Sequence, residues 1–228
     1  MQNITVLLVD DHNIVRQGLR ALLLAEGDIT IIAEAQTGRE AVQLASQHRP
    51  EVVVMDLAMP LLNGAEATRQ IMKAVPNAKV VVLSTYSDDE HLQQAISAGA
   101  AAYLLKQTAA ADLVKAIREV KRGNAYFSPM IAKRLREKTC EEPVEGQPAP
   151  QLEPELTSRE VEVLQLIAEG FANKQIAAEL GLSVKTVEKH RQAVMKKLDI
   201  HDIAGLVRHA VQKGIIEMNL AGVPSIYT

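Results

Sequence analysis

The first 122 residues alternate short apolar runs with amphipathic stretches five times over, and this order restricts the fold more than any other feature. The apolar runs, typical of strands buried on both faces, lie at residues 4–9, 29–34, 52–55, 79–84 and 102–105. Apolar residues recur at helical spacing in the stretches 13–25, 39–47, 65–75, 89–98 and 109–122. Repeated strand-then-helix order predicts an α/β fold, a doubly wound, five-stranded parallel sheet with helices on both faces.

The pattern changes after residue 122. Residues 137–154 carry several prolines and glutamates and few apolar side chains, which indicates a solvated linker, and residues 128–136 are compatible with a short helix. After residue 156 the pattern is wholly helical, with a short glycine-containing turn between two of four predicted helices. We therefore predict an α/β domain at 1–122, a linker at 123–155 and a small all-α helix-turn-helix domain at 156–228.

Composition excludes several classes of protein. No apolar run approaches the length needed to cross a membrane, and the N-terminus enters strand sequence without a charged flank and apolar signal core. The single cysteine, Cys140, lies in a polar, proline-rich stretch and cannot form an internal disulfide, which agrees with a reducing compartment. We expect a cytoplasmic protein without a membrane partner.

The net charge of −3 hides a basic segment near the C-terminus. Residues 183–213 hold seven basic and three acidic side chains. Nucleic-acid binding requires such a local surplus, although a charged stripe is also what an ordinary solvated helix face shows.

Charged and polar residues follow four of the predicted strands, where parallel strands deliver their carboxyl ends to one edge of the sheet. Asp10 and Asp11 follow the first strand and Asp56 the third, while Ser84 ends the fourth and Lys106 follows the fifth. Carboxylates gathered in this way are tolerable around a hard divalent cation, and with the lysine they suit phosphoryl chemistry. Taken singly, the acid pair could instead cap a helix, and Asp56 and Lys106 could be ordinary loop and strand-end residues.

The predicted helix 184–198 is amphipathic. Val187, Val194 and Leu198 share one face. Another face carries long donor side chains, namely Lys185, Lys189, Gln192 and Lys196. A major groove admits such a helix, and Ser183 and Thr186 at its N-terminus are placed to meet phosphates. A surface helix with its lysines in water remains the alternative.

Residues 1–122 resemble the receiver domain of two-component response regulators. The resemblance rests on the Asp10-Asp11 pair, the D-x-x-M-P-x-x-N-G loop that begins at Asp56, Ser84, and the run A-x-A-A-Y-L-L-K that ends at Lys106. It implies that a sensor histidine kinase phosphorylates Asp56. It also implies that Asp10, Asp11, Asp56 and the backbone carbonyl of Ala58 hold Mg²⁺ or Mn²⁺.

The same resemblance makes Ser84 and Tyr103 the pair that reports the acyl phosphate, with Tyr103 following Ser84 inward, and Lys106 a contact of the phosphoryl group. Taken singly, a tyrosine at this position is more often a core residue than a switch residue. Ser84 stands where threonine is commoner, and Gln107 where many receivers have proline.

Residues 156–213 are similar to the LuxR-type, NarL-like helix-turn-helix, from the run Leu156–Glu160 to Lys197 and Leu198. The resemblance implies a set of DNA-binding residues, namely Lys174, Ser183, Lys185, Thr186, Glu188, Lys189, His190, Gln192 and Lys196. Lys174 and Thr186 are implied to contact phosphates. The last helix, at about 202–213, is implied to pair two modules on DNA, although its apolar residues could equally be core.

The sequence therefore predicts a phosphorylation-controlled transcription factor and not an enzyme. Its expected partners are a sensor histidine kinase, double-stranded DNA with a two-fold site, a second copy of the chain on activation and, as a further candidate, RNA polymerase. Two rival functions are a protein-binding adaptor, suggested by Glu188 on the reading face, and an aspartate-based phosphatase. The phosphatase needs a second catalytic acid, and Ala58 two residues after Asp56 argues against it.

Overall fold

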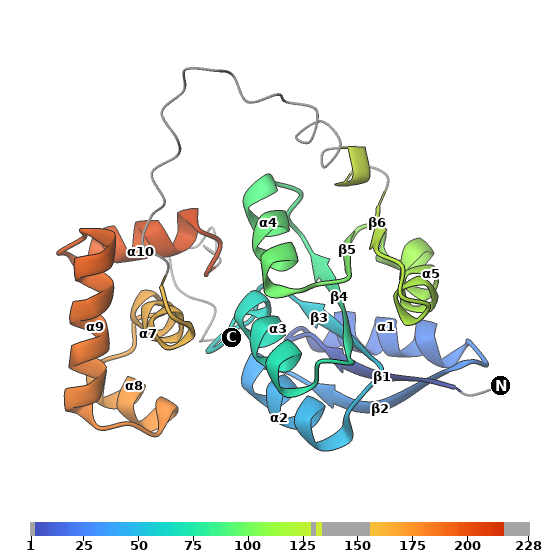
Figure 1. Cartoon of the computed structure of the whole chain (residues 1–228), viewed down its shortest axis with the longest axis horizontal. Helices are drawn as coiled ribbons and strands as arrows, with labels where there is room; N and C mark the ends of the chain where they lie inside the picture. The colour runs from blue at the N-terminus through green and yellow to red at the C-terminus, as the bar shows by residue number, and fades with distance from the viewer. Residues whose placement is uncertain (1–2, 129–130, 134–155, 217–228) are drawn as a thin grey trace. The chain divides into compact units, whose positions relative to one another are not determined.

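The computed structural model describes residues 3–128, 131–133 and 156–216, and the chain divides into two compact units, residues 1–141 and 142–228. The first unit contains a parallel sheet in the order β2-β1-β3-β4-β5-β6 (Figure 1). Its strands are β1 (Ile4–Val9), β2 (Ile29–Ala35), β3 (Val52–Asp56), β4 (Lys79–Ser84), β5 (Ala102–Leu105) and β6 (Tyr126–Phe127).

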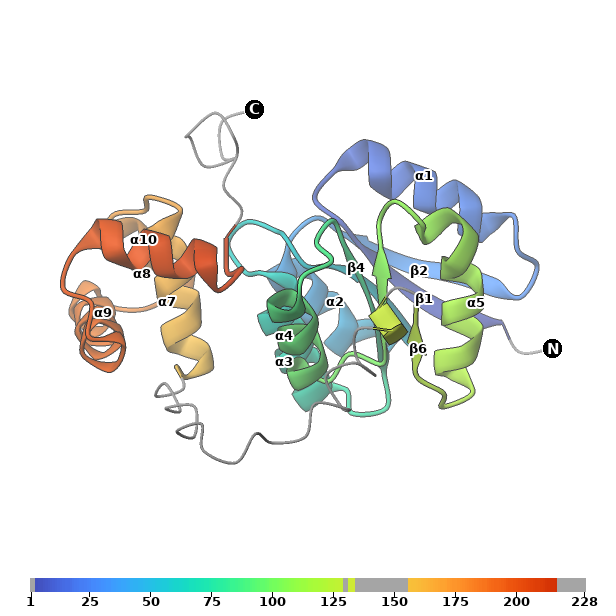
Figure 2. The same cartoon turned by 90° about the horizontal axis from the view of Figure 1, so that it is seen from above.

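Helices cover both faces of this sheet. They are α1 (Asn13–Leu24), α2 (Gly38–His48), α3 (Gly64–Ala74), α4 (Asp89–Ala98) and α5 (Ala109–Lys121). α1 and α5 lie on one face, and α2, α3 and α4 lie on the other (Figure 2). The predicted doubly wound α/β fold is confirmed.

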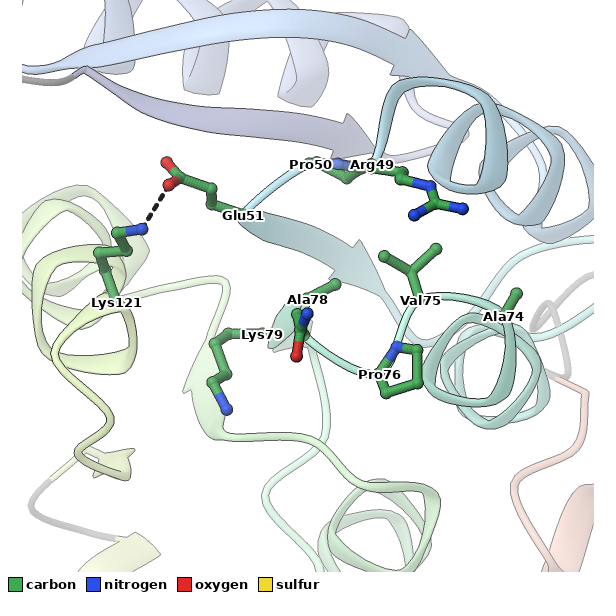
Figure 3. Close-up of a pocket in the computed structure, with 10 residues that line it drawn as sticks. Arg49, Pro50, Glu51, Ala74, Val75, Pro76, Ala78, Lys79 and Lys121 are labelled. Carbon is green, nitrogen blue, oxygen red and sulfur yellow. Dashed lines mark hydrogen bonds and ion pairs between the residues drawn. The ribbon is translucent and has the colours of Figure 1, made fainter.

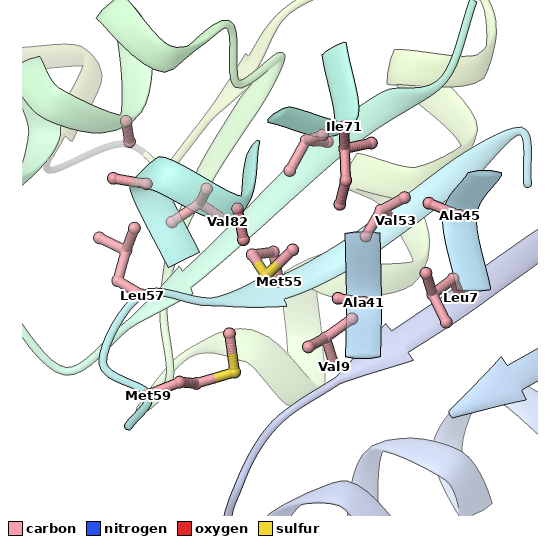
Figure 4. Packing of buried hydrophobic residues seen from close by; sticks show 14 of the residues in the cluster. Leu7, Val9, Ala41, Ala45, Val53, Met55, Leu57, Met59, Ile71 and Val82 are labelled. Carbon is pink, nitrogen blue, oxygen red and sulfur yellow. The ribbon is translucent and has the colours of Figure 1, made fainter. Parts of the chain in front are cut away.

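Alternate residues of each strand enter different cores. Leu7, Val53 and Met55 pack with Ile71 and Ala41 under α2 and α3 (Figure 4). Their neighbours along the strands, including Val6, Leu8 and Val54, pack on the opposite face with Leu113 and Ile117 of α5. Burying each large apolar side chain contributes about 1.5–3 kcal/mol, so both faces demand apolar residues. This is why the strands read as unbroken apolar runs.

The sheet has one strand more than the sequence predicted. β6 is two residues long and pairs with β5 through Tyr103 and Phe127, and the side chain of Ile131 is fully buried in the core under α2 and α3. A two-residue strand shows no periodicity, so the sequence could not reveal it. The fold of the first unit thus uses residues in the stretch predicted as a linker.

Of the short helix predicted at 128–136, residues 131–133 are helical, and the remainder lies largely outside the described residues. The proline-rich segment 137–154 and Cys140 also lie outside them.

The second unit consists of helices where the structure describes it. They are α7 (Ser158–Ala168), α8 (Asn173–Leu180), α9 (Val184–Leu198) and α10 (Ile203–Gln212). A capping box between Thr157 and Glu160 begins α7, and Gly181, with a φ of 63°, ends α8 in the left-handed conformation that glycine adopts freely. The predicted four-helix domain is confirmed.

α9 packs against α7 and α8, and α10 packs against α7. Val187 and Val194 of α9 are fully buried, as are Leu206 and Ala210 of α10, whereas Ile203 is 53% exposed. The apolar residues of α10 therefore serve the core of the unit, except at the first turn of the helix. Within the described ranges, no helix is long and apolar enough to span a bilayer.

Candidate functional site

The sheet reverses its strand order between β1 and β3, and the acidic residues lie at this point. β1 is flanked by β2 and β3, so the connections leave the two central strands in opposite directions and open a crevice at their carboxyl ends. Val9 pairs with Met55, which brings Asp10 and Asp56, the residues that follow them, to the same edge of the sheet. The strand register therefore builds the acidic site that the sequence predicted at this edge.

Asp10, Asp11, His12 and Asp56 each offer one potential ligand atom, and these atoms all lie within 4.8 Å of one another. Asp10 is fully buried, and Asp56 is 2% exposed. Asp10 Oδ2 and Asp11 Oδ1 are buried oxygens that have ion-pair partners but accept no hydrogen bond. Oxygen atoms left short of hydrogen bonds in this way fit a divalent cation, whose preferred ligands are carboxylates.

The same geometry argues against a capping role for the acid pair. His12 is the N-cap residue of α1 and makes no side-chain capping hydrogen bond. Asp10 Oδ1 accepts the backbone N–H of His12 at 2.8 Å, which lies before the first turn of the helix. The carboxylates face the crevice instead of the helix, so the α1 capping alternative is not supported.

Lys106 bridges two of the carboxylates. Its backbone N–H donates to the Ser84 carbonyl at 2.8 Å, and its Nζ lies 2.7 Å from Asp56 Oδ2 and 3.0 Å from Asp10 Oδ2. Burial raises the pKa of Asp56 to about 7, with Lys106 opposing the rise and Asp10 adding to it. Burial alone would lower the pKa of Lys106, but the two carboxylates outweigh it and raise that pKa above its ordinary value.

The loop after Asp56 is held by a close backbone approach at Gly64. The Gly64 N–H donates to the Leu57 carbonyl at 2.8 Å, and a Cβ at Gly64 would lie 1.9 Å from the Asp56 carbonyl oxygen. Asn63 caps α3 by accepting the Glu66 N–H at 2.9 Å. Ala58 donates its N–H to Asp56 Oδ1 at 3.4 Å, so this loop also contacts the central carboxylate.

Ser84 and Tyr103 lie on the sheet face that α4 covers, both almost wholly buried. The ring of Tyr103 is already inside the core, and its hydroxyl donates to the Tyr86 carbonyl at 2.9 Å. Burial raises the pKa of Tyr103 to about 12, so the hydroxyl keeps its proton for this bond. In this conformation the ring of Tyr103 therefore lies inward, and its movement with Ser84 on phosphorylation stays a prediction.

Two residues of this site were missed from the sequence. Arg16 is buried, and its Nη1 donates to the Asp10 carbonyl at 2.7 Å while its Nε pairs with Glu34 at 3.3 Å. The second residue is His12, whose side chain is 61% exposed and whose Nδ1 lies 2.8 Å from Asp11 Oδ1. The sequence did carry a signal for Arg16, because it stands among the apolar positions of α1 and a buried guanidinium requires partners.

In the second unit, the donor side chains of α9 form an exposed face as predicted. Lys185, Glu188, Lys189, Gln192 and Lys196 are exposed, and the opposite residues Val187 and Val194 are buried. Lys174 and Ser183 are exposed as well, whereas Thr186 and His190 are half-buried.

The N-terminus of α9 is built around Ser183. Its Oγ accepts the Thr186 N–H at 3.1 Å and lies 2.8 Å from Thr186 Oγ1. One of the two hydroxyl groups donates the hydrogen bond between these oxygens, and the proton of the other can be donated to a further acceptor. Side chains then fix α9 in place, because Arg191 donates to Asn173 of α8 at 3.2 Å and Lys197 pairs with Glu160 of α7 at 2.7 Å.

A cavity of about 330 Å³ lies at the opposite edge of the sheet, before β3 and β4 (Figure 3). Arg49, Pro50, Val75 and Lys79 line it, and an ion pair between Glu51 and Lys121 closes one side. None of the predicted site residues is among those that line it, so the acidic site is a separate feature at the carboxyl edge.

Comparison with known proteins agrees with both halves of this description. Residues 6–118 match the model of the response regulator receiver domain, and residues 154–210 match that of the bacterial regulatory proteins of the luxR family. The chain is 36% identical over 214 residues to the response regulator protein VraR of Staphylococcus aureus, a match that covers 94% of this chain and 99% of VraR. The chain belongs to the LuxR family of response regulators.

Solved structures of this family resemble the chain as well. A LuxR-family two-component response regulator from Aurantimonas sp. SI85-9A1 is 35% identical, with a TM-score of 0.58 over 60% of this chain and 99% of that one. A structure of two RcsB dimers bound to two parallel DNAs is 25% identical, with a TM-score of 0.56 over 91% and 98% of the respective chains.

As a LuxR-family response regulator, the protein is a transcriptional regulator of a two-component system and not a classical enzyme. The adaptor and phosphatase alternatives are therefore set aside. The chain thus has a receiver domain whose acidic pocket of Asp10, Asp11 and Asp56 is consistent with a site for a divalent metal ion.

Proposed function

We propose that this response regulator accepts a phosphoryl group on Asp56 from the phosphohistidine of a sensor histidine kinase. A carboxylate oxygen of Asp56 would attack the phosphorus as the bond to the histidine nitrogen breaks, and the imidazole leaves. The observation that carries this proposal is the pairing of Lys106 with Asp56 in a buried site, at 2.7 Å. A fixed cation beside the acceptor stabilises the charge on the transferring oxygens.

Mg²⁺ or Mn²⁺ would be held by Asp10, Asp11, Asp56 and the backbone carbonyl of Ala58. When bound, the ion neutralises phosphoryl oxygens. The chain's own residues do the remaining work: Arg16 holds the Asp10 carbonyl, and Gly64 lets the loop close over Asp56. The Ser84 hydroxyl would donate a hydrogen bond to the phosphoryl group.

Asp56→Asn should abolish incorporation of phosphate from acetyl phosphate, because the amide is not a nucleophile at this position. Incorporation is measured by mass spectrometry of the intact chain in the presence of Mg²⁺. Asp89→Asn, an acid in the first turn of α4, is the matched control and should label like the wild type. Undiminished label in Asp56→Asn would overturn the assignment.

Binding of Mg²⁺ should tighten as the pH rises through about 7. Burial raises the pKa of Asp56 to about 7, so below that pH a proton occupies the carboxylate and competes with the ion. Titration calorimetry at several pH values measures the effect, and in Asp56→Asn the dependence over this range should largely disappear. A wild-type affinity that does not change with pH would contradict the expectation.

DNA binding follows from α9. We propose that this helix lies in the major groove. Its side chains toward the bases and backbone would be Lys185, Glu188, Lys189, Gln192 and Lys196, with His190 beside them. The phosphate contacts would come from Lys174, Ser183 and Thr186. Two copies would bind a two-fold site after phosphorylation, and RNA polymerase is a further candidate partner. The structure of RcsB dimers on DNA supports this reading for a relative.

The domain limits at 122 and 156 and the cytoplasmic location stay predictions.

Lys189→Ala should weaken DNA binding about tenfold and relax its salt dependence, since it removes one cation from the reading face of α9. Fluorescence anisotropy with promoter fragments at several salt concentrations measures both quantities. Lys73→Ala removes the same charge from an exposed site on α3 and serves as the control. Equal affinity and salt slope in the Lys189 variant and the control would remove α9 from the groove.

A further inference from the structure

Tyr86, in the loop between β4 and α4, contacts both switch residues through its backbone. Its N–H donates to Ser84 Oγ at 3.0 Å, and its carbonyl accepts the hydrogen bond from the Tyr103 hydroxyl at 2.9 Å. Both partners are almost wholly buried, so breaking either bond leaves a polar group without water to replace it. A displacement of Ser84 toward Asp56 must therefore move Tyr86 or break its bond.

The ring of Tyr86 makes a second connection, to α4. It stacks on the His91 ring with the centroids 4.4 Å apart and the planes 6° from parallel. His91 lies in the first turn of α4, where the N-cap residue Asp88 accepts both its backbone N–H at 3.1 Å and its Nδ1 at 2.7 Å. A movement of Tyr86 would therefore displace the first turn of this helix.

We infer that Tyr86 is a positioning residue that couples Ser84 and Tyr103 to the N-terminus of α4, with its backbone on the switch pair and its ring on His91. This inference rests on the proposed phosphoacceptor role of Asp56. Packing alone would make the ring replaceable without consequence for signalling. If the ring couples the two sites, its removal should leave α4 unresponsive to modification of Asp56.

The test uses the full-length chain with Mg²⁺ and beryllofluoride, which occupies the place of a phosphoryl group on a carboxylate. Hydrogen–deuterium exchange of peptides that cover α4 is measured with and without beryllofluoride. In Tyr86→Ala, the beryllofluoride-dependent change should fall about fivefold or more, in line with an ordinary coupling between two sites. Tyr86→Phe, which keeps the ring stack and both backbone bonds, should restore the wild-type response.

Gln93→Ala, at an exposed position of the same helix, is the matched control and should respond like the wild type. His91→Leu removes the stack from the helix side and provides the same test if Tyr86→Ala does not fold. A wild-type response in both stack-breaking variants would overturn the inference. So would loss of the response in Tyr86→Phe, because the effect would then belong to the hydroxyl. A wild type that shows no response in α4 would also overturn the inference, and labelling of Asp56 by acetyl phosphate in the same preparation shows whether the phosphoacceptor proposal stands, which distinguishes the two failures.

Discussion

Gly64→Ala should destabilise the receiver domain by about 3 kcal/mol or more, at the upper end of what overpacking costs. The added Cβ would lie 1.9 Å from the Asp56 carbonyl oxygen and 2.8 Å from Leu57 Cα, and both are backbone atoms that cannot rotate away. The loop after β3 would have to separate from α3, which also displaces the central carboxylate. Urea unfolding followed by circular dichroism measures the loss.

Gly18→Ala is the opposite case in the same domain. Gly18 lies in the middle of α1, and a Cβ there would have nothing within 4 Å. Alanine at an open helical position should stabilise the domain by about 0.5–1 kcal/mol. Equal effects of the two substitutions would show that the close approach at Gly64 does not govern the loop.

Lys106→Met should cost about 3–5 kcal/mol of receiver stability in metal-free solution near pH 8. The substitution leaves Asp10 and Asp56, both almost fully buried, without the ammonium group that lies within 3.0 Å of each. Lys73→Met, at an exposed site, should change stability by about 0.5 kcal/mol or less. Urea unfolding in the presence of a chelator measures both variants.

The cost of Lys106→Met should shrink as the pH falls. The pKa of Asp56 is already raised to about 7 by burial, and loss of the lysine raises it further, so the folded state takes up a proton that the unfolded state does not bind. Stability contributed by that proton is present at low pH and lost as the pH rises through the folded-state pKa. The double variant Lys106→Met with Asp56→Asn should recover part of the loss, and a purely additive result would contradict the pairing.

The sequence predicted the acidic site because strand ends and chain order determine it. Asp10, Asp56 and Lys106 each follow a recognisable apolar run, and in a parallel sheet such residues must converge. The reading face of α9 was predictable for a similar reason, since helical spacing alone separates Lys185 and Lys189 from Val187.

What the sequence could not provide are contacts that depend on how separate elements approach one another. The requirement for Gly64 arises where α3 meets the end of β3, and the partners of Arg16 are the residue that follows β1 and a residue of β2. The short strand β6 is equally hidden, because its pairing with β5 depends on the chain's path after α5. The Tyr86 stack on His91 joins a loop to a helix and carries no periodic signal.

Lys106 forms ion pairs with two carboxylates, those of Asp10 and Asp56. A phosphoryl group on Asp56 would carry more negative charge than either carboxylate and would compete with Asp10 for the lysine. The ion pair between Lys106 and Asp10 would then weaken, and a metal ion would have to neutralise the charge of Asp10. Because linkage is reciprocal, the modified protein should hold its divalent cation more tightly than the unmodified one. The resting lysine bridge thus acts as an internal substitute for the ion.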